Sequence, residues 1–583
     1  MYLKHFYPAL LGLAVSPVAL AEAAYTLDEI VVTATRMPQK QNEVAGDVNV
    51  LTRADIDRAG QATLAELLRT LPGVEIVQNG GAGAVTSVFL RGASSGHTLI
   101  LVDGVRMTSA TLGSARLEHI PVGLIERIEV VRGPMSHLYG SEAIGGVIQI
   151  FTRKADGEPR LTASLGVGAY GHRSAEASVG GSAGDWRYVL AAGHDRQDGF
   201  SAKPAAYADQ DGYRNNHASL RTEYDLSADH QLDFHGFLSD GLSHFDDGVT
   251  PYDSHSDARL VNLGVGLVSR LGEHWDSTLR VDRATEDVKT QGYSDPLPWF
   301  AGGPYASRIG MAQWQYGWQL DGRTGLGDVQ LLAERLDQDI SGDVGYTRDQ
   351  RSRDALGVTW RKQVGGHGFS ASLRRDDDSQ FGGHDTGAFA YSLRFASAWH
   401  ASLSWGTAFK APGFDDLYWP GAGNPDLRPE TSENREIGLK YDSSRRAASA
   451  IVYRNDVTDL IQWAPNSSGD WLPANVASAR LQGLSLAWIE RLGAWSLRAS
   501  LDLQSPENAD TGKRLILRSR RHGSVAAEYA AGPWRLSAEL VGQGVRYNDA
   551  DNTVRLDAYT LVNLTAGYAL TPAWRLDARL DNA

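Results

Sequence analysis

The clearest pattern in the chain is an alternation of apolar and polar side chains along its C-terminal part. Trp495, Leu497, Ala499, Leu501 and Leu503 alternate with Ser496, Arg498, Ser500, Asp502 and Gln504. The segments that begin at Trp534 and Trp574 repeat this alternation. A period of two places apolar side chains on one face of a β-strand and polar ones on the other. From about Arg160 onward, the chain is therefore predicted to form many amphipathic strands.

Two all-β folds fit such strands. A soluble sandwich alternates in the same way, with one face on its core. A transmembrane barrel needs strands of roughly nine to eleven residues, as seen here, and it carries aromatic girdles at the membrane interfaces. The tryptophans stand at the strand starts, and charges lie on one face only. The pattern favours an all-β transmembrane barrel of antiparallel strands, assigned to residues 156–583.

A compact mixed domain is predicted before the barrel, over residues 44–155. The spacing of Ile56, Leu64, Leu67 and Leu68 predicts one helix over residues 52–70, ended by a Leu-Pro-Gly stop. Short strands are predicted at residues 74–78, 88–91, 98–102, 125–131 and 146–152, with a hairpin turn at 103–104. Glycines at 140, 145 and 146 lack the spacing of a phosphate loop, so turns and close packing explain them.

The first residues predict export. Lys4 and His5 precede an apolar run at residues 10–20, and residues 19–21 have the small-x-small form of a signal-peptidase site. Residues 1–21 are assigned to a signal peptide, and residues 22–43 to a segment ahead of the mixed domain. This segment contains LDEIVVTATR (27–36), whose β-branched residues favour an extended backbone. Such a peptide either adds to a partner's sheet edge or forms an ordinary first strand.

Composition narrows the function classes. The 583 residues include no cysteine, which excludes disulfides and cysteine-based zinc sites. The net charge of -14 argues against a general nucleic-acid binder, because such proteins need basic patches. After the N-terminal apolar run, the sequence contains no stretch of about eighteen consecutive apolar residues, so no membrane-spanning helix is predicted. A mean hydropathy of -0.31 fits a barrel, because lipid-facing and lumen-facing side chains average out.

Several motifs together resemble the TonB-dependent outer-membrane receptors. They are LDEIVVTATR (27–36), LPGVEIVQNGG (71–81), FLRG (89–92), LILVDGVR (99–106), IERIEVVRGPMSHLYGSEAIGGVIQI (125–150), GTAFKAPGFDDLY (406–418), NPDLRPETSENREIG (424–438) and YRNDVTDLI (453–461). Their order spans nearly the whole mature chain, and the cobalamin (vitamin B12) branch is the most similar. The resemblance implies about 22 antiparallel strands with an α+β plug domain inside, in the outer membrane of a Gram-negative bacterium.

The resemblance also implies a transport function. A monomer would carry cobalamin or a related corrinoid into the periplasm, driven by TonB and its inner-membrane complex, and deliver it to a periplasmic cobalamin-binding protein. Uptake of an iron-siderophore or another metal chelate is the alternative. A barrel enzyme is the third class, but the sixteen histidines are scattered and a plug would obstruct the lumen. No covalent cofactor is expected.

Site residues are carried over from the family by position. The TonB-binding residues are Leu27, Asp28, Glu29, Ile30, Val31, Val32, Thr33 and Ala34. The ligand-binding residues are Val85, Ser87, Ser94, Thr111, Leu112, Ser307, Arg520 and Tyr547. Plug–barrel ion pairs are expected between Arg91 and Arg132 on one side and Glu430 and Glu433 on the other.

Calcium is expected in the extracellular loops. The implied ligands are Tyr207, Asp209, Asp211, Phe245, Asp246 and Asp257. Calcium takes six to eight oxygens, and a DxD pair points two carboxylates to one side of an extended loop. Ser201 stands where the family has another carboxylate, for which Asp240 or Asp247 could compensate.

The last residues predict one more strand. Outer-membrane barrels resembling this chain finish on a strand that closes with an aromatic residue, whereas this sequence stops at Leu580-Asp581-Asn582-Ala583. An unclosed barrel would expose a sheet edge to lipid. A C-terminal strand and its loop are therefore expected beyond residue 583.

Overall fold

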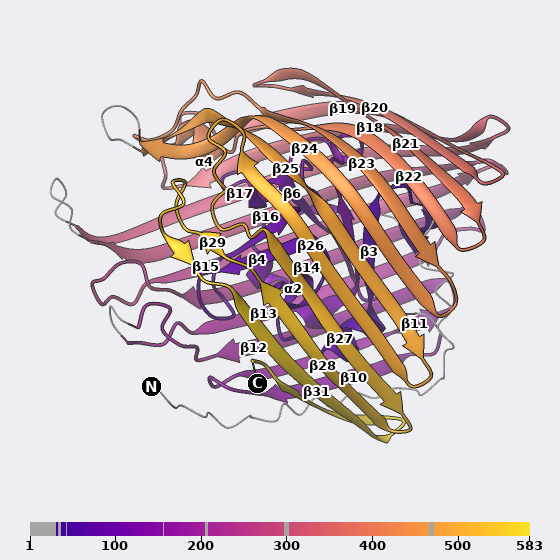
Figure 1. Ribbon diagram of the computed structural model, residues 1–583, viewed down its shortest axis with the longest axis horizontal. Coiled ribbons are helices and arrows are strands. Elements are labelled where there is room, and N and C mark those ends of the chain that lie inside the picture. Colours follow the sequence, from indigo (N-terminus) through magenta and orange to yellow (C-terminus); the bar gives the residue numbers. More distant parts are fainter. Residues whose placement is uncertain are drawn as a thin grey trace.

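The computed structural model describes residues 31–32, 36–41, 44–155, 157–204, 208–295, 302–465 and 471–582. The predicted signal peptide (1–21), residues 27–30, 33 and 34 of the predicted TonB-binding peptide, and Tyr207 lie outside the described residues. The described chain forms a large curled sheet with a smaller domain inside it (Figure 1).

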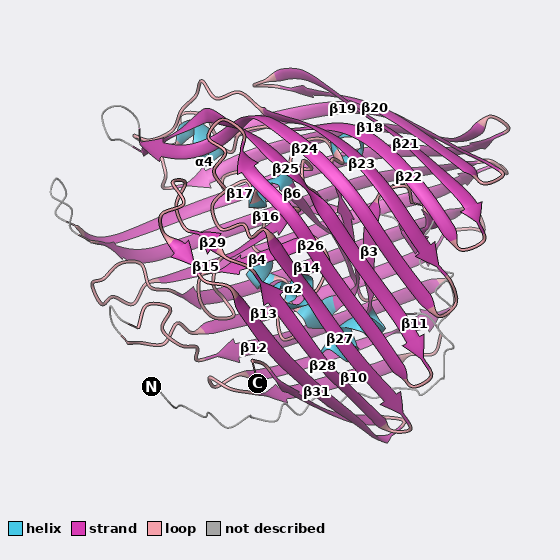
Figure 2. Cartoon of the chain, viewed as in Figure 1, coloured by secondary structure: helices cyan, strands magenta, loops and turns pink. Residues whose placement is uncertain are grey.

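The curled sheet has 21 antiparallel strands in the described part of the chain (Figure 2). Each strand pairs with the next along the chain, apart from a small β29–β30 hairpin (Arg546–Tyr547 and Arg555–Leu556). The predicted all-β barrel is confirmed, and Trp495, Trp534 and Trp574 each begin a strand. A further C-terminal strand stays a prediction.

The strands of the barrel are β10 (Arg160–Val167), β11 (Arg173–Ala183), β12 (Trp186–Gln197), β13 (Tyr213–Asp225), β14 (His230–His244), β15 (His255–Leu271), β16 (Trp275–Ser294), β17 (Gly303–Thr324), β18 (Gly327–Gly342), β19 (Gln350–Val364), β20 (His367–Asp378), β21 (Gly382–Ala396), β22 (Trp399–Lys410), β23 (Glu430–Asp442), β24 (Arg446–Pro465), β25 (Trp471–Leu492), β26 (Trp495–Asn508), β27 (Arg521–Ala531), β28 (Trp534–Gln543), β31 (Tyr559–Thr571) and β32 (Trp574–Leu580).

The two ends of the barrel differ in their connections. At one end, strands are joined by turns of two to four residues, and at the other mostly by longer loops such as 198–212 and 411–429. The loop 411–429 carries a short helix, α4 (Phe414–Tyr418). Short turns on one side and long loops on the other are typical of outer-membrane barrels, whose long loops face outward.

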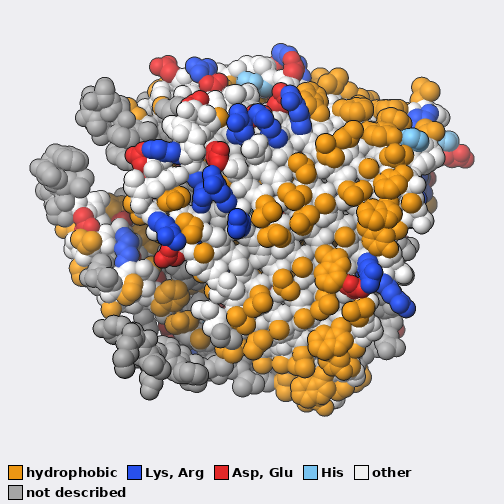
Figure 3. Space-filling view, viewed as in Figure 1, with side chains coloured by type: hydrophobic (Ala, Val, Ile, Leu, Met, Phe, Trp, Pro, Cys, Tyr) orange, Lys and Arg blue, Asp and Glu red, His pale blue; other side chains and the backbone are white. Residues whose placement is uncertain are grey.

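An aromatic girdle marks the short-turn end. Trp186, Trp495 and Trp534 each begin a strand, are about half exposed and pack with tilted rings against tyrosines directly across the sheet. Figure 3 shows the apolar band across the outer wall, with Lys and Arg side chains gathered on its long-loop side. Such a girdle is where strands enter the membrane interface, so the wall is built to face lipid.

The N-terminal domain lies inside the curled sheet, drawn in indigo and violet in Figure 1. Its five-stranded sheet has the order β3-β8-β9-β6-β7, in which β6 and β9 are parallel. Its strands are β3 (Asp47–Thr52), β4 (Val74–Gln78), β5 (Thr86–Leu90), β6 (Thr98–Val102), β7 (Val105–Arg106), β8 (Ile125–Arg132) and β9 (Gly146–Thr152). Its α-helices are α1 (Arg53–Ala59), α2 (Leu64–Arg69) and α3 (Ser136–Tyr139), and its 3-10 helices are η3 (Ser95–His97), η4 (Leu117–His119) and η5 (Val122–Leu124). The predicted α+β domain and its strands are confirmed.

The single helix predicted over residues 52–70 is wrong. Gly60 ends α1 with a φ of 63°, and its N–H donates to the Ile56 carbonyl at 3.1 Å. Thr63 then starts α2 through a capping box with Glu66. The apolar spacing continues across the break, so periodicity alone did not reveal it, whereas the Gly60 stop and the Thr-x-x-Glu start were both readable signals. No helix in the described part of the chain is both long and apolar enough to cross a membrane.

One apolar core joins this domain to the wall. Buried side chains such as Leu67, Leu90 and Ile148 belong to a cluster that also contains Phe237 and Leu260 of the barrel. Burial of the apolar side chains of this cluster stabilises the fold of the domain. The other lumen-facing side chains of the wall are largely polar. We call this domain (residues 44–155) the plug.

Close packing of β8 against β9 gives a first prediction. Gly146 has a φ of 147°, and a Cβ there would lie 2.2 Å from the Val131 carbonyl oxygen. Gly146→Ala should therefore destabilise the plug by about 1–3 kcal/mol. Amide hydrogen exchange in β8 and β9 should speed up about tenfold or more, measured by mass spectrometry on the intact protein. Gly46→Ala is the matched control, because no heavy atom lies within 4 Å of its Cβ position; equal exchange in both variants would contradict this account.

Candidate functional site

The lumen is lined by polar side chains, and these hold the plug. Asn215, Asn262 and Asp282 are buried on the inner face, where strand alternation has to place polar groups if the outer face is apolar. Plug and wall meet through ion pairs such as Arg116 with Glu286, at 2.7 Å between Nε and Oε1. The interface therefore combines ion pairs and hydrogen bonds with the apolar contacts described above.

Arg91 is the centre of a cluster of such contacts. Its Nη1 lies 2.5 Å from Glu436 Oε2 on β23, and its Nη2 lies 2.9 Å from Asp47 Oδ2 in the plug. Arg132 approaches the other oxygen of Asp47 at 3.2 Å. Although burial opposes it, Arg132 and Arg91 hold the pKa of Asp47 below its usual value. The cluster joins β3 and β8 of the plug to β23 of the wall.

The predicted pairing of Arg91 and Arg132 with Glu430 and Glu433 is wrong in its partners. The side chain of Glu433 is 45% exposed and lies on the outer face, where it accepts a hydrogen bond from Trp405 Nε1 at 2.9 Å. Glu430 is buried and meets the plug through His97, at 2.8 Å. Side chains of a strand alternate between faces, so an odd spacing of three puts Glu430 and Glu433 on opposite sides. The spacing from Glu430 to Glu436 is even, so these two side chains lie on the same face of the strand. The motif therefore already indicated that Glu436, and not Glu433, faces the plug.

A third cluster was missed from the sequence. Glu75 in β4 accepts a hydrogen bond from Ser519 N at 3.1 Å and lies 3.1 Å from His522 Nδ1. On the other side of that ring, Asp502 lies 3.3 Å from Nε2 and accepts the Gly73 N–H at 2.7 Å. These five residues come from three separate segments, 73–75, 502 and 519–522, so only the fold brings plug and wall together here.

The predicted TonB-binding peptide is described at Val31–Val32 (β1) alone. β1 pairs antiparallel with Gln39–Lys40 (β2), in a sheet separate from that of the plug. Arg36, between them, lies 2.6 Å from Glu334 of β18. The extended backbone predicted for these two residues is confirmed, and β1 is not a strand of the plug's own sheet.

The plug presents two apolar tips towards the long-loop end. Val85 and Leu112 are 61% and 56% exposed, the highest values among the plug's large apolar side chains that are described. A Cβ at Gly81 would lie 3.8 Å from the Phe200 ring, so the loop that carries Val85 lies under the loop 198–212. These two predicted ligand-binding residues are free to contact a molecule that enters the mouth.

The other predicted ligand-binding residues divide into two groups. Ser87, Ser94, Ser307 and Tyr547 are half-buried, and Ser94 Oγ accepts a hydrogen bond from Arg518 at 3.2 Å. Thr111 is buried, with its hydroxyl 2.8 Å from that of Ser109. Its side chain does not face the open mouth.

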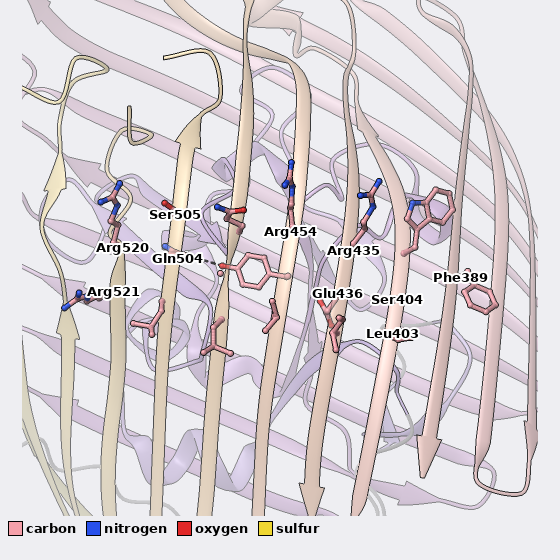
Figure 4. Close-up of a pocket in the computed structure, with 18 residues that line it drawn as sticks. Phe389, Leu403, Ser404, Arg435, Glu436, Arg454, Gln504, Ser505, Arg520 and Arg521 are labelled. Carbon is pink, nitrogen blue, oxygen red and sulfur yellow. Dashed lines mark hydrogen bonds between the residues drawn. The ribbon is translucent and has the colours of Figure 1, made fainter. Parts of the chain in front are cut away.

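Arg520 is placed on the outer wall. It pairs with Glu507 at 2.9 Å, on the face of β26 opposite to the buried Asp502 and Gln504. It lines an outer groove of about 960 Å³. Figure 4 shows it at one side of this groove, with Arg454 and Arg435 on strands further along the wall. The prediction that Arg520 binds ligand in the mouth is therefore not supported by its position, because the wall lies between.

Three carboxylates of the predicted calcium site come together. Oxygens of Asp209, Asp211 and Asp246 lie within 4.8 Å of one another. Ser201 Oγ donates to Asp246 Oδ2 at 3.2 Å, so the serine in the place of a family carboxylate still belongs to the cluster. Burial and the neighbouring carboxylates, Asp246 first, raise the pKa of Asp209. Burial, and then Asp246 and Asp209, raise the pKa of Asp211 in the same way.

Asp257 and Asp247 do not join these three carboxylates. Asp257 lies on β15, opposite Leu242, and is exposed on the face away from the buried Ala258. Asp247 is occupied elsewhere, because it accepts the Tyr305 hydroxyl at 2.7 Å. Phe245 closes its own loop through its N–H, which donates to Ser254 O at 3.0 Å.

With fold and site described, two family models identify the class of protein. The TonB-dependent Receptor Plug Domain matches residues 40–147, and the TonB dependent receptor-like, beta-barrel family matches residues 154–583. The chain belongs to the TonB-dependent receptors. Members of this family interact with TonB and bind a ligand, and this protein is located in the outer membrane of a Gram-negative bacterium.

The most similar relatives found are vitamin B12 transporters. The chain is 34% identical to the vitamin B12 transporter BtuB of Photobacterium profundum, over 98% of this chain and 95% of that protein. It is 33% identical to BtuB of Vibrio vulnificus, over 96% and 91%.

Solved structures share the fold at lower identity. A variant of the ferric enterobactin receptor PfeA from Pseudomonas aeruginosa has a TM-score of 0.78 at 19% identity, covering 95% of this chain and 94% of that one. The siderophore receptor PirA from Acinetobacter baumannii has a TM-score of 0.76 at 16% identity, covering 92% and 98%.

The Arg91 cluster gives a second prediction. Arg91→Ala leaves Asp47 and Glu436 buried without their shared cation, which should destabilise the plug by about 3–5 kcal/mol. The plug should open more often, which planar-bilayer conductance would register as new openings. Glu433→Ala, at the residue first expected to pair, should leave conductance unchanged because that carboxylate lies on the outer face and does not contact the plug. Openings in the Glu433 variant but not in the Arg91 variant would refute the assignment.

Proposed function

We propose that this receptor carries cobalamin or a related corrinoid across the outer membrane into the periplasm, using energy from TonB. The observation that carries the proposal is the 34% identity to a vitamin B12 transporter over nearly the full length of both chains. The exposed Val85 and Leu112 at the mouth suit the apolar surface of a large ligand. The decisive test is direct binding of cyanocobalamin to the purified receptor, and absence of binding at micromolar concentration would overturn the proposal.

The mechanism follows from the filled lumen. A plug joined to the wall by buried ion pairs leaves no path for a ligand as large as cobalamin, so the plug has to move or change shape. The outer membrane holds no ATP, so the work comes through the N-terminal peptide. β-strand addition by TonB at residues 27–34 would place a pulling force on a segment that leads through Arg36 into β3.

The proposed transport cycle makes and breaks no covalent bond, so the proposed function is that of a transporter and not of an enzyme. It would work as a monomer, because one chain supplies both wall and plug. On the inner side, a periplasmic cobalamin-binding protein would receive the ligand. Neither TonB nor the periplasmic cobalamin-binding protein would require a cofactor bound covalently to the receptor.

We further propose calcium at Asp209, Asp211 and Asp246. Three carboxylates within 4.8 Å are the donors that calcium prefers. Asp246 Oδ1 is buried and has no hydrogen-bond partner in the described part of the chain, which fits an oxygen reserved for a cation. Calcium there would join the loop 198–212 to the loop 245–254 and order the mouth.

Uptake of an iron-siderophore or another metal chelate is the second candidate. The observation in its favour is that PfeA and PirA share this fold, although their low identity carries no ligand preference. Competitive uptake separates the two candidates. Excess ferric siderophore should leave labelled cobalamin uptake unchanged if the first proposal is correct.

The peptide gives a third prediction. Val32→Pro removes a backbone donor and fixes φ, so it should block strand addition. Cobalamin uptake by cells should fall to background, while binding at the cell surface stays within about twofold of the parent protein. Val32→Ile keeps the donor and the β-branched shape, and should retain uptake. Loss of surface binding in the proline variant would show that the segment serves the fold instead.

The acidic cluster gives a fourth prediction. Asp246→Asn should weaken calcium binding about tenfold or more in titration calorimetry, whereas Asp257→Asn should not, because Asp257 lies outside the cluster. The raised pKa values of Asp209 and Asp211 mean that protons compete with calcium at a higher pH than for ordinary aspartates. Affinity should therefore fall as the pH is lowered towards those values. Equal effects of the two variants would contradict the site.

A further inference from the structure

A second group of possible metal ligands stands at the tip of the β14–β15 hairpin. His244 is the last residue of β14, His255 is the first of β15, and Asp253 lies in the loop between them. One ligand atom from each lies within 4.8 Å of the others. In the described part of the chain, this is the one such group that contains histidine.

The two histidines are held side by side by the sheet. They are direct cross-strand partners. The His244 N–H donates to Gly212 O on the other side, and the next N–H, of Phe245, donates to Ser254 O at 3.0 Å. His244 and His255 therefore form a pair without backbone hydrogen bonds between them, the kind whose side chains approach most closely. The ring centroids are 5.5 Å apart.

The hydrogen bonds leave one nitrogen of each ring available. His255 Nδ1 lies 2.9 Å from the Asp253 carbonyl oxygen, which can only accept, so this nitrogen carries the proton and Nε2 keeps its lone pair. His244 Nδ1 lies 2.9 Å from the Asp253 carboxylate, which orients that ring too. Histidines that bind metals usually have one ring nitrogen oriented in this way.

We infer that His244, Asp253 and His255 form a binding site for a divalent transition metal of the zinc and copper class. Two imidazoles and a carboxylate suit such ions, whereas calcium prefers oxygen alone. Bonds of about 2.0–2.1 Å need only small rotations of three partly exposed side chains. The fourth position is open to water or to a group from outside.

The surroundings favour a cation here. Asp253 is near enough to Asp209 to contribute to the raised pKa of that carboxyl, so the new site adjoins the acidic cluster. The 245–254 loop, whose two ends the metal would join, also carries Asp246. Its Val249 N–H and Thr250 hydroxyl donate to Asp295, at 2.7 Å each, in the next loop. A metal at the hairpin tip would thus tie together the loops around the mouth.

The experiment uses the full-length receptor without a histidine tag, with calcium at saturation so that the acidic cluster is filled. Titration calorimetry with Zn²⁺ should detect one site. His244→Gln and His255→Gln should each weaken Zn²⁺ binding about tenfold or more. Cu²⁺ in the same protein should show nitrogen hyperfine splitting in its EPR spectrum, and each variant should lose part of it.

His230→Gln is the matched control, because it changes a histidine at the opposite end of the same strand. Its Zn²⁺ affinity should equal that of the parent protein. Asp246→Asn tests the neighbouring cluster and should leave Zn²⁺ binding within about threefold. Heat-modified mobility on gels confirms that each variant is folded.

Three results would overturn the inference: no Zn²⁺ binding tighter than about 100 μM, unchanged affinity in both histidine variants, or loss of Zn²⁺ binding when calcium is added. The inference does not rest on which ligand is transported. A receptor that binds Zn²⁺ here but no corrinoid would overturn the proposed function and leave this site standing.

Discussion

The structure depends on one constraint, that backbone polar groups cannot remain unpaired in lipid. A curled antiparallel sheet satisfies it strand by strand, and the pleat then assigns every second side chain to lipid and the others to the lumen. An apolar outer face therefore forces a polar inner face. In this receptor that inner face is not left to water. It carries the partners of the plug, from Glu286 to Glu436 and Glu430.

Holding the plug by charges suits the proposed mechanism, in which the plug moves or changes shape. A buried ion pair specifies position well, but it gains little net stability over the separated and hydrated groups. Removing one partner of a buried ion pair costs several kcal/mol of free energy, because the other charge stays buried and unpaired. Hydrating both partners at once costs less. A pull that wets the Arg91 and Glu75 clusters could thus release the plug without unfolding its apolar core around Leu67 and Ile148.

At the long-loop end of the barrel, acidic and imidazole side chains connect the loops. Asp246 and Asp295 each accept hydrogen bonds from a neighbouring loop, and Asp247 accepts one from Tyr305 at the start of β17. Asp209 and Asp211 meet Asp246 from the 198–212 segment. Loops this rich in carboxylates repel one another unless cations or donors lie between them. At the proposed calcium and zinc sites, the order of the mouth would therefore be coupled to ion binding.

The sequence by itself determined the class of fold, because alternation, strand-start tryptophans and turn residues are local properties. The strands at 74–78, 98–102 and 146–152 were predicted to the residue, and so was the DxD part of the acidic cluster. Only the tertiary structure decided which charges meet. Glu436 rather than Glu433 reaches Arg91, Arg520 lies outside the wall, and His244 faces His255, because strand face and register depend on pairings between distant segments.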